Sequence, residues 1–186
     1  MSRGSMTRRS RRGFSLIEVI AVIVILGIVG GATSSLILTS VASFTDSSGR
    51  IQLHSEASVT LDRLVREFRE IDPDPQAGPP HPDIAQAGRS SLRWSGGIRS
   101  VRLAGTTLLL DTDGVHEDVL CEGVSELTMN FMDESNRSLL VAGAVPAGDL
   151  PSIQRIAIRL SVMRQGMTET LTTRVFIRAA MTGETP

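Results

Sequence analysis

The sequence predicts an α+β protein in which one long N-terminal helix precedes an antiparallel sheet. Three observations predict it: an unbroken apolar segment at residues 14–38, an amphipathic helical pattern after it, and strand-like runs separated by glycine-containing turns in the second half. With 186 residues, the chain is long enough for one domain and an appendage.

The apolar segment is long enough to cross a membrane. From Phe14 to Leu38 only Glu18 is charged, and a helix of about 20 apolar residues spans a bilayer, whereas the apolar core of a signal peptide has roughly 7 to 15. Arginines precede the segment and none follows it before Arg50. The positive-inside rule then predicts a cytoplasmic N-terminus, with residues 40–186 in the periplasm or its equivalent.

An amphipathic stripe predicts that the helix continues and packs on a sheet. The apolar positions recur at spacings of four, three, four and three residues, at Ala57, Leu61, Leu64, Phe68 and Ile71. On the other face we expect solvated i,i+4 ion pairs, namely Asp62 with Arg66, Arg63 with Glu67, and Arg66 with Glu70. The proline that follows Asp72 should end the helix.

The rest of the chain predicts a connector and a sheet. Residues 72–82 hold five of the eight prolines, which indicates a surface connector, either a plain linker or a polyproline-like recognition segment. Alternation and turn residues predict strands at 91–94, 98–103, 107–111, 117–121 and 125–132, and a hairpin near 156–162 and 171–177 that turns at Gln165 and Gly166.

The run Arg11-Arg12-Gly13-Phe14-Ser15-Leu16-Ile17-Glu18-Val19 resembles the type III signal of type IV pilins and type II secretion pseudopilins. The resemblance implies that a membrane prepilin peptidase and methyltransferase cuts between Gly13 and Phe14 and N-methylates Phe14. It also divides the chain into a leader (1–13), a transmembrane and filament-core helix (14–38), an amphipathic helix (39–72) and a periplasmic β-rich head (73–186). The expected location is the bacterial inner membrane, and then a filament.

Glu18 is the one charged residue in the apolar segment. A carboxylate at the bilayer centre costs on the order of 2.5 to 3.5 kcal/mol, unless its side chain reaches the interface. The resemblance implies instead that Glu18 pairs with the Phe14 ammonium of an adjacent subunit. This pairing would reward the correct register in assembly.

The stretch Gly27 to Ser35 is rich in small residues. Each glycine lowers helix stability by about 1 kcal/mol relative to alanine. Two interpretations stay open: close packing between membrane helices, and local melting when the subunit leaves the bilayer.

The head has a looser resemblance to J-type minor pseudopilins, through residues 64–69, 122–127 and 174–178. It implies a non-enzymatic subunit of a type II secretion system that helps to assemble or cap the tip of the pseudopilus, with other pseudopilins or pilins as partners. One alternative is a minor type IV pilin that primes a surface pilus. Another, from a different class, is a signal-anchored periplasmic binding or sensor domain.

Other chemistries have little support in the sequence. Without residues 1–13, 14 arginines face 20 acidic residues, a net charge of −6, which disfavours nucleic-acid binding. Asp111-Thr112-Asp113-Gly114 resembles the start of a calcium loop but lacks the later glutamate, so we expect a hairpin turn and no metal. His54, His81, His116 and Cys121 are too scattered for zinc, we expect no cofactor, and Trp94 should be a core residue.

Overall fold

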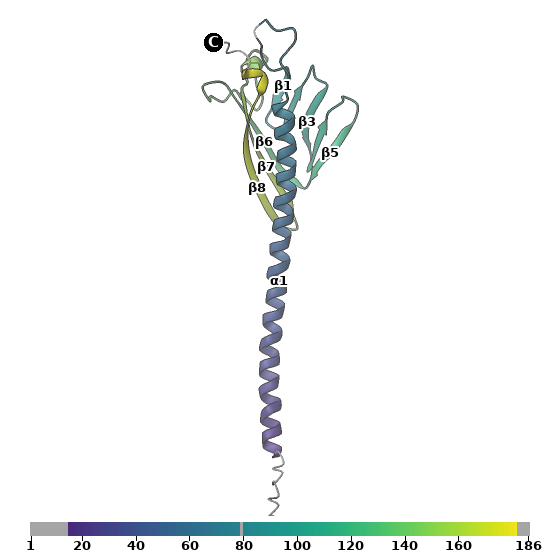
Figure 1. Cartoon of the computed structure of the whole chain (residues 1–186), viewed down its shortest axis with the longest axis vertical. Helices are drawn as coiled ribbons and strands as arrows, with labels where there is room; N and C mark the ends of the chain where they lie inside the picture. Colours follow the sequence, from purple (N-terminus) through teal and green to yellow (C-terminus); the bar gives the residue numbers. More distant parts are fainter. Residues whose placement is uncertain (1–14, 79, 182–186) are drawn as a thin grey trace, which may run out of the picture. The chain divides into compact units, whose positions relative to one another are not determined.

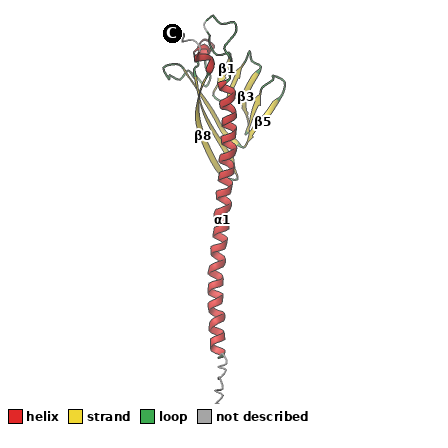
Figure 2. Ribbon diagram, in the orientation of Figure 1, coloured by secondary structure: helices red, strands yellow, loops and turns green. Residues whose placement is uncertain are grey.

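The computed structural model describes residues 15–78 and 80–181, and it shows one long helix followed by two antiparallel sheets (Figures 1 and 2). This is the predicted α+β layout. The chain divides into two compact units, residues 1–47 and residues 48–186.

The helix α1 spans Leu16–Arg69 and contributes to both units. The five-stranded sheet has the order β1-β2-β3-β4-β5 and the three-stranded sheet has the order β6-β7-β8. Their bounds are β1 Ile84–Gly88, β2 Ser91–Trp94, β3 Arg99–Ala104, β4 Thr107–Asp111, β5 Glu117–Glu122, β6 Val124–Met132, β7 Arg155–Arg164 and β8 Met167–Phe176. Two 3-10 helices, η1 Ala147–Ser152 and η2 Arg178–Met181, complete the head.

The second half of α1 supplies one wall of the core. The predicted stripe is confirmed, because each of its residues is buried: Ala57, Leu61, Leu64, Phe68 and Ile71. Both sheets contribute to the same hydrophobic cluster, including Trp94 from β2 and Ile158 from β7. Trp94 meets Phe68 edge to face with ring centroids 5.6 Å apart, so it is a core residue as predicted.

The sequence predicts a solvated polar face for α1, but part of this face is buried. Glu67 is only 3% exposed, and its two carboxylate oxygens lie 2.8 Å from Arg63 Nη2 and 2.9 Å from Arg99 Nη2. Arg99 lies on β3, so the i,i+4 spacing of the helix could not predict that it would pair with Glu67. Among the described residues the other two expected i,i+4 pairs, Asp62 with Arg66 and Arg66 with Glu70, are not ion pairs in the structure.

Strand β1 was not predicted from the sequence. Its residues, Ile-Ala-Gln-Ala-Gly, have weak strand preference. They pair with β2 all the same, with an irregularity in the register between Ile84 and Gln86. Tertiary pairing therefore overrides the local preference here.

The β7–β8 hairpin forms where the alternation predicted it. Its register runs from Arg164 opposite Met167 to Arg155 opposite Phe176 without an irregularity. The two loop residues, Gln165 and Gly166, have φ values of 52° and 79°. Positive φ at both loop positions is the requirement of a type I′ turn, whose twist matches that of the strands.

The proline-rich connector is closed at its base by a short pairing between its two ends. Pro73 and Pro82 form an isolated antiparallel bridge. Proline has no N–H to donate, so the neighbouring residues supply the bonds: Asp74 N–H to His81 O at 2.8 Å, and Asp83 N–H to Asp72 O at 2.9 Å.

Candidate functional site

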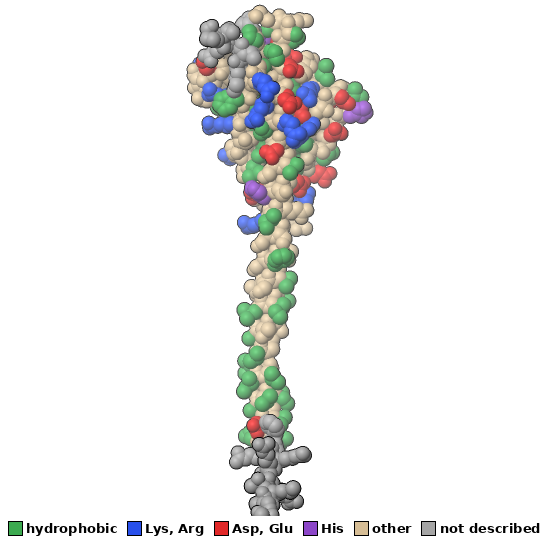
Figure 3. Space-filling model, in the orientation of Figure 1, with side chains coloured by type: hydrophobic (Ala, Val, Ile, Leu, Met, Phe, Trp, Pro, Cys, Tyr) green, Lys and Arg blue, Asp and Glu red, His purple; other side chains and the backbone are tan. Residues whose placement is uncertain are grey.

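The candidate site is the first part of α1, whose apolar side chains are exposed in the single chain. Their exposed fractions run from 45% at Val19 to 80% at Leu16. Figure 3 shows hydrophobic side chains along this part of the helix, whereas charged side chains gather on the head. By length and composition α1 contains a segment able to cross a membrane. Apolar area of this extent needs a covering, either lipid or other helices.

Ser15 caps the start of this helix. The Glu18 N–H lies 3.0 Å from Ser15 O and 3.4 Å from Ser15 Oγ. Ser-x-x-Glu ahead of an apolar run is a sequence signature of a helix N-terminus. This role was not predicted, although the signature is present at residues 15–18. The acidic Glu18 in the first turn also complements the positive end of the helix dipole.

The Glu18 side chain is exposed, and among the described residues its carboxylate has no hydrogen-bond or ion-pair partner. It is therefore available to a cation from another molecule. The other two predicted site residues, Gly13 and Phe14, lie outside the described residues, so the structure does not test the cleavage position.

Hydroxyl groups within and just after the apolar segment bond to their own helix. The recorded bonds run from a side chain to the carbonyl four residues earlier, at 2.8 to 3.0 Å: Thr33 to Val29, Ser34 to Gly30, Thr39 to Ser35, Ser40 to Leu36, and Thr45 to Val41. Such bonds satisfy the hydroxyl without water. They make these polar residues compatible with an apolar surrounding.

The glycines of the small-residue stretch leave one surface of the helix bare. A Cβ added at Gly27, Gly30 or Gly31 would meet nothing within 4 Å. α1 is helical through this stretch in the single chain. Space of this kind lets another helix approach closely.

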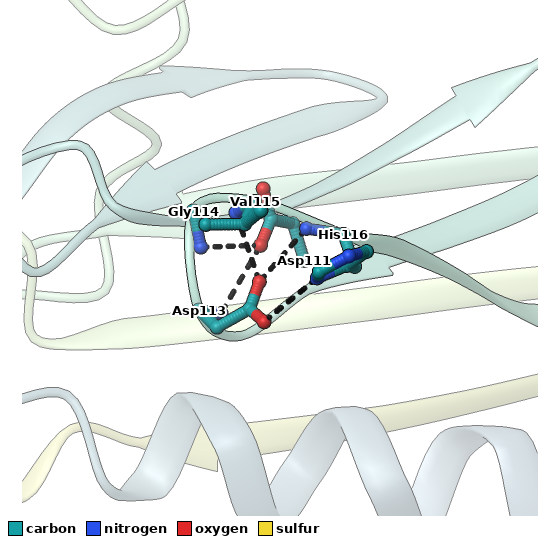
Figure 4. Close-up of polar contacts among 5 residues, drawn as sticks. All are labelled: Asp111, Asp113, Gly114, Val115 and His116. Carbon is teal, nitrogen blue, oxygen red and sulfur yellow. Dashed lines mark hydrogen bonds and ion pairs between the residues drawn. The ribbon is translucent and has the colours of Figure 1, made fainter.

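The Asp111–His116 turn uses its carboxylates for its own backbone (Figure 4). Asp111 Oδ1 accepts the N–H of Asp113 at 3.1 Å and of Gly114 at 2.7 Å. Asp113 Oδ1 accepts the N–H of Val115 at 2.9 Å and of His116 at 2.8 Å. These bonds, first that from the His116 N–H, hold the pKa of Asp113 far below its usual range.

In the part of the chain that the structure describes, no three His, Cys, Asp or Glu side chains cluster in a way that could hold a metal ion. Each histidine lies near a different carboxylate: His54 near Glu169, His81 near Asp74, and His116 near Asp113. Cys121 is buried and free.

Comparison with known proteins points to the same end of the chain. Residues 8–34 match the prokaryotic N-terminal methylation motif. No curated protein matches the chain.

The motif is the signal of type IV pilins and pseudopilins, and the long apolar helix before antiparallel sheets is a pilin-like layout. The chain therefore carries the methylation signal of type IV pilins and pseudopilins ahead of a pilin-like fold. The motif implies processing by a prepilin peptidase and assembly with other pilins, and the apolar helix suggests a membrane anchor.

Proposed function

We propose that this protein is a non-enzymatic minor pseudopilin, J-like, that helps to assemble or cap the tip of the periplasmic pseudopilus of a type II secretion system. One observation carries the assembly role: an exposed apolar helix that holds a single unpartnered carboxylate, Glu18, within a methylation motif. A filament covers such a helix with its neighbours and supplies the counter-charge.

In this proposal the peptidase cuts between Gly13 and Phe14 on the cytoplasmic face of the inner membrane and methylates Phe14. The Phe14 ammonium of one subunit then pairs with Glu18 of the next. In a low-dielectric surrounding an unpaired charge is costly, so a subunit out of register is disfavoured.

Two features of the head support a minor subunit. The Asp111 and Asp113 carboxylates stabilise a turn, so this loop is unlike the calcium sites that major pseudopilins often have. Two of the three segments that resemble J-type subunits, 64–69 and 174–178, meet at one cleft of about 260 Å³, lined by Arg69, Arg174, Phe176 and Arg178.

Mass spectrometry of the mature N-terminus tests the proposal. In cells that contain the peptidase we expect a chain that begins at Phe14 and carries one added methyl group. An intact Met1, or cleavage at another bond, would remove the filament role and favour a helix-anchored periplasmic domain. Co-purification in detergent then separates the secretion role from the pilus role, because each predicts different pilin-like partners.

A further inference from the structure

The two sheets of the head have four edge strands, and two of these are covered. At β1, the N–H of Val145 reaches Ala87 O at 2.8 Å and that of Arg89 reaches Gly143 O at 2.9 Å. At β6, the N–H of Met129 reaches Arg89 O at 2.7 Å, and the segment after β6 returns with Leu139 N–H 2.8 Å from Phe131 O. Among the described residues, β5 and β8 have no main-chain bonds beyond their own sheets.

The two open edges differ in their protection. Strand β5 has six residues, of which Glu117, Asp118 and Glu122 are acidic, and its pairing with β4 is irregular. Short length, charge and irregularity are devices that stop an edge from pairing with another chain. Strand β8 has ten residues, a regular register, and neither proline nor glycine. Apart from two charged residues, Glu169 and Arg174, it has none of these protective devices.

The main-chain groups of β8 that point away from β7 can be identified, because the direction of these groups alternates from one residue to the next along a strand. Ile177 N–H bonds to Gln154 O at 3.0 Å, so in the antiparallel ladder the odd-numbered residues of β8 face β7. The N–H and C=O groups of the even-numbered residues then point to the open edge. Their side chains are all exposed: Thr168, Thr170, Thr172, Arg174 and Phe176. Three are threonines, which favour strand pairing.

A cluster of arginines lies at the C-terminal end of this edge. Arg69, Arg174 and Arg178 line the cleft of about 260 Å³ beside Phe176, and the Arg155 guanidinium lies 4.9 Å from the centre of the Phe176 ring. Among the described residues none of the four forms an ion pair, whereas Arg63, Arg99, Arg102, Arg137 and Arg164 all do.

The cluster is a basic site on an acidic protein. Glu70 and Asp72 line the adjoining cavity of about 180 Å³, but neither forms an ion pair with an arginine in the described part of the chain. Beyond residue 13 the chain has 14 arginines and 20 acidic residues. Among the described residues these four guanidinium groups have no carboxylate partner, although Arg155 donates a hydrogen bond to Asn136 Oδ1. Such a cluster selects a carboxylate-bearing partner, because arginine binds carboxylates in a two-pronged geometry.

We propose that β8 accepts an extended, acidic segment of a second, different pilin-like subunit by strand addition. The open edge supplies main-chain bonds, and the cluster of Arg69, Arg155, Arg174 and Arg178 receives the acidic side chains of the segment. Main-chain pairing gives affinity and the side-chain contacts give specificity. This inference rests on the proposed assembly role, which brings subunits side by side at high effective concentration.

Photo-crosslinking of the full-length protein in its own cells tests the proposal. A photoreactive phenylalanine analogue in place of Thr168 should crosslink to an acidic segment of another chain with an N-terminal methylation motif. Thr172→Pro removes an outward N–H and should lower the yield about tenfold, and the double variant Arg174→Glu, Arg178→Glu should do so as well. Thr172→Val and Arg159→Glu are the matched controls, and they should leave the yield unchanged.

The thermal midpoint and the N-terminus of each variant are measured together with the yield. If Thr172→Pro destabilises the head, the exposed arginine variant decides the test. Three results would overturn the strand-addition proposal alone. The first is no adduct in correctly cleaved protein, and the second is an adduct that neither variant weakens. The third is an adduct formed mainly with a second copy or with a protein lacking the motif. An uncleaved N-terminus overturns the proposed function as well.

Discussion

At the scale of single residues, two glutamates of α1 show how surroundings decide the role of a carboxylate. Glu67 is buried and lies between Arg63 and Arg99, so its charge is compensated within the chain. Glu18 is exposed in an apolar segment, and among the described residues it has no partner. The first therefore contributes to folding, and the second is the carboxylate that we propose acts in assembly.

Glu18→Ala should still be inserted and cleaved, because the apolar segment and the cleavage bond are unchanged. We expect the amount that co-purifies in detergent with its pilin-like partners to fall about tenfold or more, since the incoming ammonium loses its counter-charge in a low-dielectric site. Quantitative immunoblotting of the co-purified fraction measures this, with Asp46→Ala, an exposed carboxylate on the same helix, as the control. Normal co-purification of Glu18→Ala would contradict the pairing.

Glu67→Gln should lower the free energy of unfolding of the head by about 1–3 kcal/mol, because the ion pairs with two arginines are lost at a buried position. Chemical denaturation of the mature protein in detergent measures the change. The exposed Asp62→Asn, on the same helix, should change it by less than about 0.5 kcal/mol. Equal effects of the two variants would show that the Glu67 ion pairs are not structural.

At the scale of elements, turns decide how the strands of the head are shared between two sheets. Gly123 separates β5 from β6, and so separates the five-stranded sheet from the three-stranded one. Its φ is +74°, and an added Cβ would lie 2.7 Å from Met163 O. Gly166 in the β7–β8 turn has a similar φ of +79°, but an added Cβ there would meet nothing within 4 Å.

Gly123→Ala should therefore destabilise the head more than Gly166→Ala. Both variants impose the left-handed conformation on alanine, at about 1–2 kcal/mol, but only the first forces a methyl group against a backbone oxygen of β7. We expect a difference of at least about 1 kcal/mol between them in denaturation experiments. Similar losses would indicate that the chain shifts freely at Gly123.

At the scale of the whole molecule, one core joins the second half of α1 to both sheets. Cys121 of β5 belongs to it and is 3% exposed. Burial raises the pKa of the Cys121 thiol, and the thiolate is the reactive form. Since it is the single cysteine of the chain, its reactivity reports the opening of this core.

Cys121 should react with a thiol reagent at least about 100-fold more slowly in the folded protein than in denaturant. The measurement is the rate of absorbance change with an aromatic disulfide reagent. A Cys121→Ser, Thr172→Cys double variant, with its thiol on the exposed face of β8, should react as fast folded as unfolded. Fast reaction of native Cys121 would show that the β5 side of the core opens locally.

Features that depend on nearby residues could be predicted from the sequence. The apolar segment, the buried stripe from Ala57 to Ile71, and the hairpin at Gln165 and Gly166 all follow from spacing and turn chemistry. So does the methylation signal around Glu18, since a peptidase substrate is a short linear segment. The serine cap at Ser15 has a local signature too.

Only the tertiary structure decided which groups from distant parts of the chain meet. It buried Glu67 against Arg99 of β3, recruited the weak strand β1, and placed Arg69 beside Arg174 and Arg178. Among the described residues it also left the β8 edge unpaired, while the loop before η1 covers β1. The physical reason is that hydrogen bonds and ion pairs between distant segments depend on how the sheets pack on the helix, which local periodicity does not encode.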